Sequence, residues 1–221
     1  MRLTHTSWNF QIEFDEENVC QLIIENIDNF RHLISELHSQ LMLGEGSYTL
    51  WDDEILDFRS SVKLIVNPLD LDINSRKIIA GVYKNICDII NDNMYLDLCN
   101  IYAEIHSLIS DAEDRLMYRL EWDSDVNMNR ILKAFDVKVR KEDLTFEEKL
   151  IDYVELLQEF ANVKCFIFVN LKDYCSEISL EKICRQWRYL EAFVLFIESR
   201  EKYDIENEKT WIIDKDLCEI Y

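Results

Sequence analysis

Apolar and polar residues alternate with two different periods along the chain, and the period predicts where strands and helices lie. Trp8–Phe14 alternates side chain by side chain, as a half-buried strand does. The polar turn Asp15–Asn18 separates it from the apolar Val19–Ile24, so the two segments predict an antiparallel hairpin. Two further short strands are expected at Tyr48–Trp51 and Ser61–Val66.

Apolar residues three and four apart predict helices through the first two thirds of the chain. Ile27–Leu43 has such a stripe and is ended by the glycine-containing Gly44–Gly46. Asn74 is expected to be the N-cap of a long helix with Ile78–Ile90 on its apolar face. A second long stripe, Leu98–Leu116, follows the short polar stretch 91–93, so the two predict a helical hairpin, and Val126–Phe135 adds another helix.

The last third of the chain has the pattern of a parallel sheet. Thr145–Ala161 reads as a helix that begins with a capping box, Thr145 with Glu148. The strands Cys165–Val169, Phe193–Ile197 and Trp211–Ile213 are apolar throughout, as strands buried on both faces are. The first two flank a helix, Ser179–Leu190.

This strand–helix–strand order predicts an α/β fold with a short, largely parallel sheet. We expect residues 1–73 and 140–221 to form an α/β head domain, with residues 74–139 inserted between them as a helical leg domain.

Composition narrows the class of protein. The chain has 221 residues, one Pro, three Gly and a net charge of −20. It shows no signal peptide and no apolar run long enough to span a bilayer, so we expect a soluble cytoplasmic protein without a membrane partner. Its seven scattered Cys contain no CxxC pair, which favours small buried thiols over disulfides or a zinc ribbon.

One short stretch has a positive net charge although the chain as a whole is strongly negative. Arg130, Lys133, Lys138, Arg140 and Lys141 stand against a single acid, Asp136. In so acidic a protein such a strip is useful for binding a polyanion only where a groove or channel focuses its field. Arg76 and Lys77 extend the set as candidate phosphate-binding residues. Ordinary helix-surface cations paired with nearby acids remain the alternative.

An acidic stretch precedes the basic strip. Glu121, Asp123 and Asp125 alternate with other residues at the junction between two predicted helices. Several hard oxygen ligands on a flexible segment suit Ca²⁺ better than Mg²⁺. The alternative is a solvated acidic turn that caps the next helix through Asp125.

The sequence lacks the motifs of nucleotide binding and of nucleophilic catalysis. The nearest glycine pair, Gly44 and Gly46, has no Lys and places Glu45 where phosphates would lie, so we expect no nucleotide cofactor. The four His form no recognisable constellation and no GxSxG occurs, so we expect no enzymatic activity.

The order of segments resembles a known family, the small type II-A CRISPR-associated spacer-acquisition proteins often called Csn-two. The resemblance covers nearly the whole chain. The matching segments are Gln21–Ile24, Asn26–Phe30, Leu69–Ser75, Leu120–Asp123, Ile131–Val139, Phe166–Asn170, Val194–Glu198 and Ile213–Asp216. Asp136 departs from the family pattern, which has Gly there, and Trp122 stands where relatives have an acid.

The resemblance implies a bacterial, non-catalytic protein with a degenerate NTPase-like sheet. It implies a homotetrameric ring that binds double-stranded DNA ends without sequence specificity, and Ca²⁺ ions that hold the helical legs. It also implies partnership with the CRISPR integrase and effector nuclease. Glu121 and Asp123 fall on the family's metal-site acids, and Lys133 and Lys138 on its basic positions near the hole. An acidic protein-interaction module of a defence complex that never touches DNA is the competing hypothesis.

Overall fold

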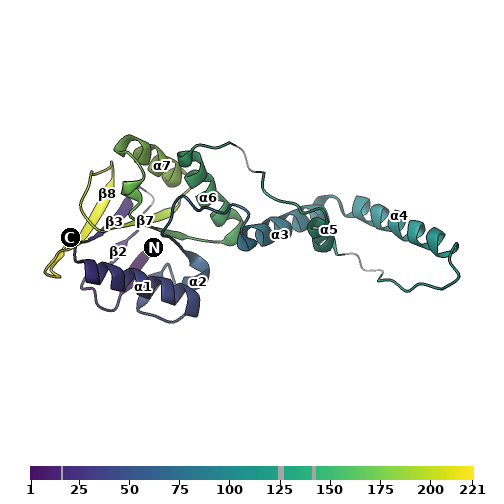
Figure 1. Cartoon of the computed structure of the whole chain (residues 1–221), viewed down its shortest axis with the longest axis horizontal. Coiled ribbons are helices and arrows are strands. Elements are labelled where there is room, and N and C mark those ends of the chain that lie inside the picture. Colours follow the sequence, from purple (N-terminus) through teal and green to yellow (C-terminus); the bar gives the residue numbers. More distant parts are fainter. Residues whose placement is uncertain (16, 124–126, 141–142) are drawn as a thin grey trace. The chain divides into compact units, whose positions relative to one another are not determined.

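The chain divides into two compact units. The computed structural model describes residues 1–15, 17–123, 127–140 and 143–221 (Figure 1). One unit combines Met1–Ile73 with Lys141–Tyr221, and we call it the head unit; the other is Asn74–Arg140, which we call the helical unit. Each unit has its own internal packing and is described by itself.

A six-stranded sheet forms the centre of the head unit. Its strand order is β5-β6-β7-β3-β8-β9. These strands are β3 (Val19–Ile24), β5 (Val62–Ile65), β6 (Cys165–Val169), β7 (Phe193–Glu198), β8 (Glu208–Ile213) and β9 (Glu219–Ile220). Every neighbouring pair is parallel except β8 and β9, so the predicted α/β class with a largely parallel sheet is confirmed.

A smaller antiparallel sheet replaces the hairpin that the sequence predicted. Its order is β2-β1-β4, with β1 at Arg2–His5, β2 at Ile12–Glu13 and β4 at Tyr48–Trp51. The predicted pairing of Trp8–Phe14 with Val19–Ile24 is therefore wrong. All six residues of β3 are buried, and such a strand is stable only inside a sheet, where β3 lies between β7 and β8.

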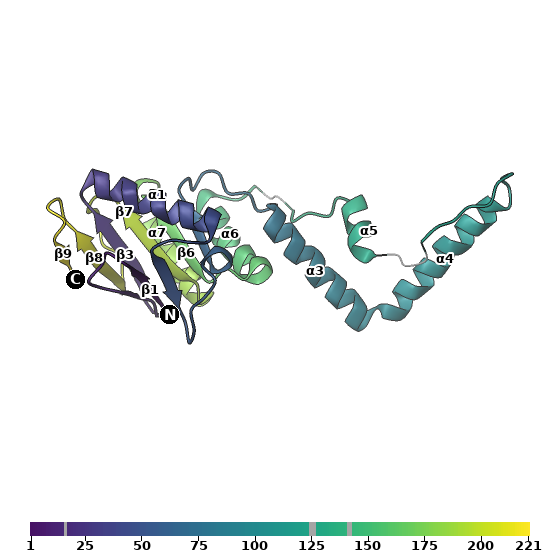
Figure 2. The ribbon, with the colours of Figure 1, turned by 90° about the horizontal axis from the view of Figure 1, so that it is seen from below.

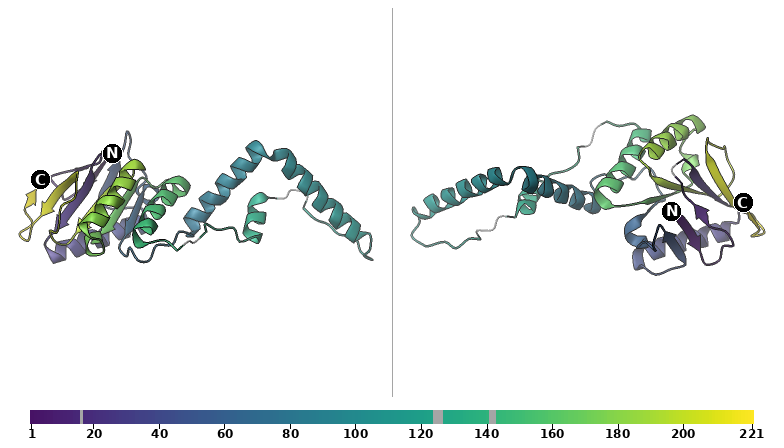
Figure 3. Two further views of the ribbon diagram at one scale, coloured as in Figure 1. Left: turned by 90° about the horizontal axis from the view of Figure 1, so that it is seen from above. Right: turned by 180° about the vertical axis from the view of Figure 1, so that it is seen from behind.

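Helices cover both faces of the six-stranded sheet (Figures 1 and 3). The head-unit helices are α1 (Ile27–Leu43), α2 (Phe58–Ser61), α6 (Phe146–Ala161), α7 (Glu177–Tyr189) and a short 3₁₀ turn, Leu171–Asp173. Because successive strand residues point to opposite faces, β6 supplies Ile167 to the cluster that includes Leu37 of α1. On the other face, Phe168 stacks on Trp187 of α7 with ring centroids 4.9 Å apart.

Local sequence signals fix the ends of two head-unit helices. The Asn26 side chain accepts a hydrogen bond from the Asn29 backbone at the start of α1, and Gly44 ends it with a φ of 91°. Thr145 and Glu148 form the predicted capping box at the start of α6. These predictions are confirmed.

The helical unit contains α3 (Arg76–Asn93), α4 (Tyr95–Glu113) and α5 (Met128–Ala134). The predicted N-cap Asn74 is wrong, because Ser75 takes that position and the Asn74 amide bonds elsewhere. The predicted helical hairpin is also wrong. Only Met94 separates α3 from α4, and α4 diverges from α3 (Figure 2) without a single buried residue.

Within the described part of the chain, no helix is both long enough and apolar enough to cross a bilayer.

Asp15 and Lys209 link the turn before β3 to strand β8, with Asp15 Oδ2 and Lys209 Nζ 2.6 Å apart. Burial raises the pKa of Asp15, but hydrogen bonds from Lys209 and Asn18 outweigh it and lower that pKa from 3.8 to about 2. A depressed pKa in the folded state contributes stability above the unfolded pKa of about 3.9 and loses it as the pH falls.

We therefore expect Asp15→Asn to lower the free energy of unfolding at pH 6, and the difference from wild type to shrink between about pH 4 and pH 2. Urea unfolding at a series of pH values measures it. A difference that stays constant down to pH 2 would contradict the assigned link.

Candidate nucleic-acid interface

Basic residues are distributed unequally between the two units. The helical unit holds nine Lys and Arg against eleven Asp and Glu. The rest of the chain holds fifteen Lys and Arg against thirty-three Asp and Glu, a net charge of −18. The helical unit is thus close to neutral, and it alone can approach a polyanion without strong repulsion by its own charge.

Helix α5 and the segment after it carry most of the predicted basic residues. The Asn127 side chain accepts a hydrogen bond from the Asn129 backbone and begins α5. Arg130 and Lys133 lie on this helix and are both exposed. Asn127 is therefore the cap of α5, whereas Asp125, the cap in the alternative interpretation of the acidic stretch, lies outside the described residues.

Helix α5 ends in a Schellman motif. The backbone N–H of Asp136 bonds the carbonyl of Lys133, and that of Val137 bonds the carbonyl of Leu132. Asp136 has a φ of 50°, a left-handed conformation that glycine adopts without steric strain. The Asp136 carboxylate lies 2.5 Å from Lys138 Nζ, and this hydrogen bond raises the pKa of Lys138.

Two side chains fasten the segment after α5 to helix α3. The Asn74 amide accepts a hydrogen bond from the Val139 backbone N–H at 2.9 Å and donates one to the Val139 carbonyl at 3.1 Å. The buried Tyr83 donates its hydroxyl to the Val137 carbonyl at 3.0 Å. Because Lys138 lies between these anchors, it is held beside the start of α3.

The structure thereby brings two predicted basic groups to one end of the helical unit. Arg76 and Lys77 are exposed in the first turn of α3, two and three residues after the Asn74 anchor. Lys138 and Arg140 are exposed on the fastened segment. Lys141, the fifth base of the predicted strip, lies outside the described residues.

The predicted metal ligands lie on the segment that follows α4. The Leu120 backbone N–H donates to the Glu113 carboxylate at 2.8 Å, and the Trp122 indole donates to His106 Nδ1 at 2.9 Å. These contacts fasten the segment to α4 and leave Glu121 and Asp123 exposed. Asp125 lies outside the described residues.

Those two carboxylates do not make a complete cation site. Among the residues that the structure describes, no three His, Cys, Asp or Glu side chains are close enough to hold a metal. Glu121 and Asp123 supply at most about four of the six to eight oxygens that Ca²⁺ requires. Further ligands have to come from water, backbone carbonyls, Asp125 or another chain.

A serine–histidine–glutamate chain in the head unit was not expected from the sequence. His5 Nδ1 lies 2.8 Å from Ser7 Oγ, and His5 Nε2 lies 3.0 Å from Glu36 Oε2. Ser47 also bonds the Glu36 carboxylate, and this hydrogen bond is the largest cause of its lowered pKa. Glu36 is 31 residues from His5 in sequence, so no local pattern could have revealed the cluster.

The geometry of this chain fits a structural role. The His5 side chain is only 4% exposed and lies against the Tyr48 ring, with centroids 4.5 Å apart. The Thr6 and Trp8 backbone N–H groups bond backbone carbonyls, and that of Ser7 bonds His5 Nδ1. None of the three is left to stabilise an oxyanion, as nucleophilic catalysis by Ser7 would require.

Helix α4 presents apolar side chains to solvent. Leu96 is 77% exposed and Leu108 is 71% exposed. Ile101, Ile105 and Leu108 are spaced three and four residues apart, so they share one face of the helix. Contiguous exposed apolar surface is typical of interaction sites in proteins.

Comparison with known proteins identifies the class. The profile described as "CRISPR-associated protein (Cas_Csn2)" matches residues 40–217. The chain belongs to this family of CRISPR-associated proteins, which confirms the resemblance found in the sequence.

Individual relatives agree with the family match. A Streptococcus agalactiae protein described as "CRISPR-associated protein Csn2" is 20% identical over 207 residues, covering 90% of this chain and 89% of the relative. One of the same description from Enterococcus faecalis is 21% identical over 205 residues, covering 91% and 90%.

A solved structure supports the fold. The crystal structure of Stu0660 of Streptococcus thermophilus superposes with a TM-score of 0.61 and 16% identity, covering all of this chain and 76% of that one. At this identity the similarity concerns the fold alone.

Asp136 provides a direct check on the end of α5. We expect Asp136→Gly to raise the free energy of unfolding by up to about 1 kcal/mol, because glycine accepts a positive φ and the exposed ion pair that it removes contributes little. Thermal unfolding measures the change. Asp136→Ala, which keeps the strain and also removes the ion pair, is the control and should not be stabilised; a Gly variant less stable than wild type would contradict the assignment.

Proposed function

We propose that this protein is a non-catalytic DNA-binding ring that acts in CRISPR spacer acquisition. Four copies assemble and bind double-stranded DNA ends without reading sequence, together with the CRISPR integrase and effector nuclease. Ca²⁺ stabilises the helical units and the channel, and no nucleotide is involved. Membership of the Cas_Csn2 family supports the CRISPR role. Family membership alone does not identify the DNA-binding surface.

The observation that carries the DNA-binding proposal is the segregation of charge. Exposed bases gather in a near-neutral helical unit, whereas the head unit has a net charge of −18. Phosphate contacts from Lys and Arg give affinity without sequence specificity. The acidic head repels the duplex, so the bases of the helical unit determine where DNA binds.

The exposed apolar face of α4 supports self-assembly. Burying a Leu or Ile side chain completely contributes about 1.5–3 kcal/mol. A second copy of the chain is the partner proposed for this face. Repeating one subunit's bases around a ring multiplies a weak patch into a continuous positive lining.

The head unit also supports a competing function. Its net charge of −18 suits a basic protein partner, and an acidic interaction module without DNA binding would need no basic surface. Charge reversal in the helical unit separates the two functions, because only DNA binding depends on those bases.

We expect the double variant Lys133→Glu and Lys138→Glu to bind a blunt duplex at least about tenfold more weakly than wild type at about 0.1 M salt. The slope of log affinity against log salt should become shallower by roughly 0.9 for each phosphate that the variant no longer neutralises. Fluorescence anisotropy with duplexes of two unrelated sequences measures both quantities.

The matched control changes the same net charge in the head unit. Lys182→Glu with Arg185→Glu, two exposed bases of α7, should change duplex affinity by less than about threefold. Equal weakening in both double variants, or a flat salt response in wild type, would mean that the helical unit is not the DNA-binding surface.

The calcium proposal has a separate test. We expect Glu121→Gln with Asp123→Asn to weaken Ca²⁺ binding at least about tenfold in calorimetry, because both changes remove charged oxygen ligands. Asp92→Asn with Asp97→Asn, two exposed acids near the α3–α4 junction, removes equal charge and should leave Ca²⁺ affinity unchanged. Wild type that takes up no Ca²⁺ would refute the proposal.

A further inference from the structure

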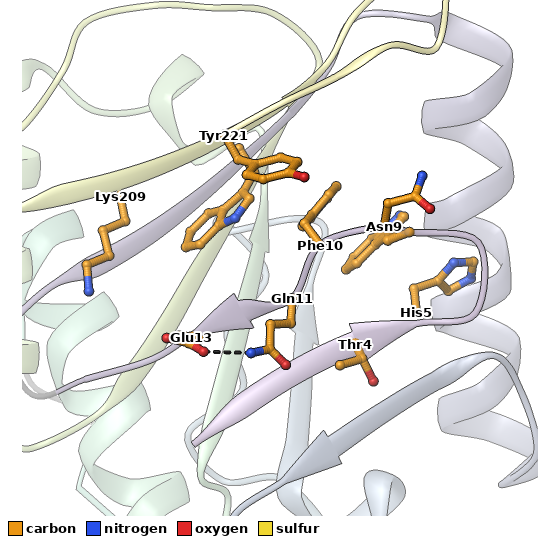
Figure 4. A pocket seen from close by; sticks show the side chains of 10 residues that line it. Thr4, His5, Asn9, Phe10, Gln11, Glu13, Lys209 and Tyr221 are labelled. Carbon is orange, nitrogen blue, oxygen red and sulfur yellow. Dashed lines mark hydrogen bonds between the residues drawn. The ribbon is translucent and has the colours of Figure 1, made fainter.

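A groove on the head unit remains outside the proposed DNA-binding function. It has a volume of about 660 Å³ and lies between the β1–β2 loop and strand β8 (Figure 4). Trp8 and Phe10 line it from the loop, Glu13 from β2, and Lys209 and Trp211 from β8. Every lining residue belongs to the head unit, so the groove is complete within that unit.

Aromatic rings form much of its surface. The rings of Trp8 and Phe10 stack with centroids 5.0 Å apart and planes 10° apart. Phe10 also lies 6.5 Å from Trp211 and 5.9 Å from Tyr221. Tyr221 is 75% exposed, so a large aromatic face is open to a ligand. Such faces attract cations, and arginine most often.

Carboxylates border these rings. Glu13 lines the groove itself, and the Glu219 carboxylate accepts a hydrogen bond from the backbone N–H of the lining residue Asn9 at 3.1 Å. Two more carboxylates bond other lining residues: Glu36 bonds His5, and Asp15 bonds Lys209. Lys209, the lysine that lines the groove, is paired with Asp15, so Glu13, Glu36 and Glu219 are the nearby carboxylates that it does not pair with.

Aromatic rings beside carboxylates favour a cationic ligand over an anionic one. Nucleic-acid bases can stack on aromatic rings, but the phosphates that accompany them would be repelled by these carboxylates and by the net charge of the head unit. A guanidinium or ammonium group gains from both the rings and the carboxylates.

One feature favours a polypeptide over a free cation. Strand β2 lies at the edge of its sheet, where an extended segment can lie alongside. We propose that this groove binds an extended, arginine- or lysine-bearing segment of a partner protein.

The test uses the full chain and dye-labelled peptides of eight residues, (Arg-Gly)₄, (Gln-Gly)₄ and (Glu-Gly)₄, in fluorescence anisotropy at about 0.15 M salt. We expect the arginine peptide to bind at least about tenfold more tightly than the glutamine peptide. Glu13→Gln with Glu219→Gln should weaken its binding at least about tenfold, and Tyr221→Ala at least about threefold.

The matched control is Glu155→Gln with Glu159→Gln, two exposed acids of α6 that do not line the groove. It removes the same charge and should change peptide affinity less than twofold. Equal weakening by both double variants would mean attraction to the overall charge and would overturn the proposal, as would equal binding of the arginine and glutamine peptides.

The groove variants should also bind duplex DNA as wild type does, because the candidate bases lie in the helical unit. Weakened peptide binding with intact duplex binding therefore supports the groove. A wild type that binds the arginine peptide but no duplex would refute the proposed function and leave the groove proposal standing.

Discussion

The helical unit leaves the apolar side chains of helix α4 exposed, and this constraint underlies the proposed assembly. Helix α4 contains no buried residue, whereas helices in proteins gain most of their stability from the packing of an apolar face. The segment that contains Leu120 and Trp122 is fastened onto it by two hydrogen bonds. Packing against further copies of the chain would bury the face that contains Leu108. The proposed self-assembly would thus both stabilise the helices and bring together the bases that they carry.

The two units differ in net charge and therefore suit different ligands. The head unit gains stability from a largely apolar sheet and tolerates its charge of −18 because the acids lie mainly at its surface. A buried pair, Lys172 and Glu208 at 2.8 Å, is an exception within that core. The near-neutral helical unit suits phosphate, and the aromatic groove of the head unit suits a cationic peptide. The two proposed surfaces therefore attract ligands of opposite charge and lie in different units.

Sequence patterns predicted elements where one local cause dominated. The Ile27–Leu43 helix and the Cys165–Val169 strand match the structure residue for residue, because an apolar stripe or an uninterrupted apolar run determines each. The hairpin failed because pairing of Val19–Ile24 depends on strands about 175 residues later in the chain. The prediction that Asn74 is the N-cap of α3 failed because its side chain accepts a hydrogen bond from the backbone of Val139, 65 residues away. The His5–Glu36 contact and the groove could not be predicted either, because they also form between residues that are distant in sequence. Which bases line a channel depends on other copies of the chain and stays a prediction.

Native mass spectrometry in the presence of Ca²⁺, with and without a short blunt duplex, tests the central claim most directly. Each chain contributes 26.6 kDa, so copy number and bound duplex are read from one spectrum. The account predicts a species of four chains that takes up one duplex. A monomer that binds no duplex, or monomers that each bind one independently, would contradict it.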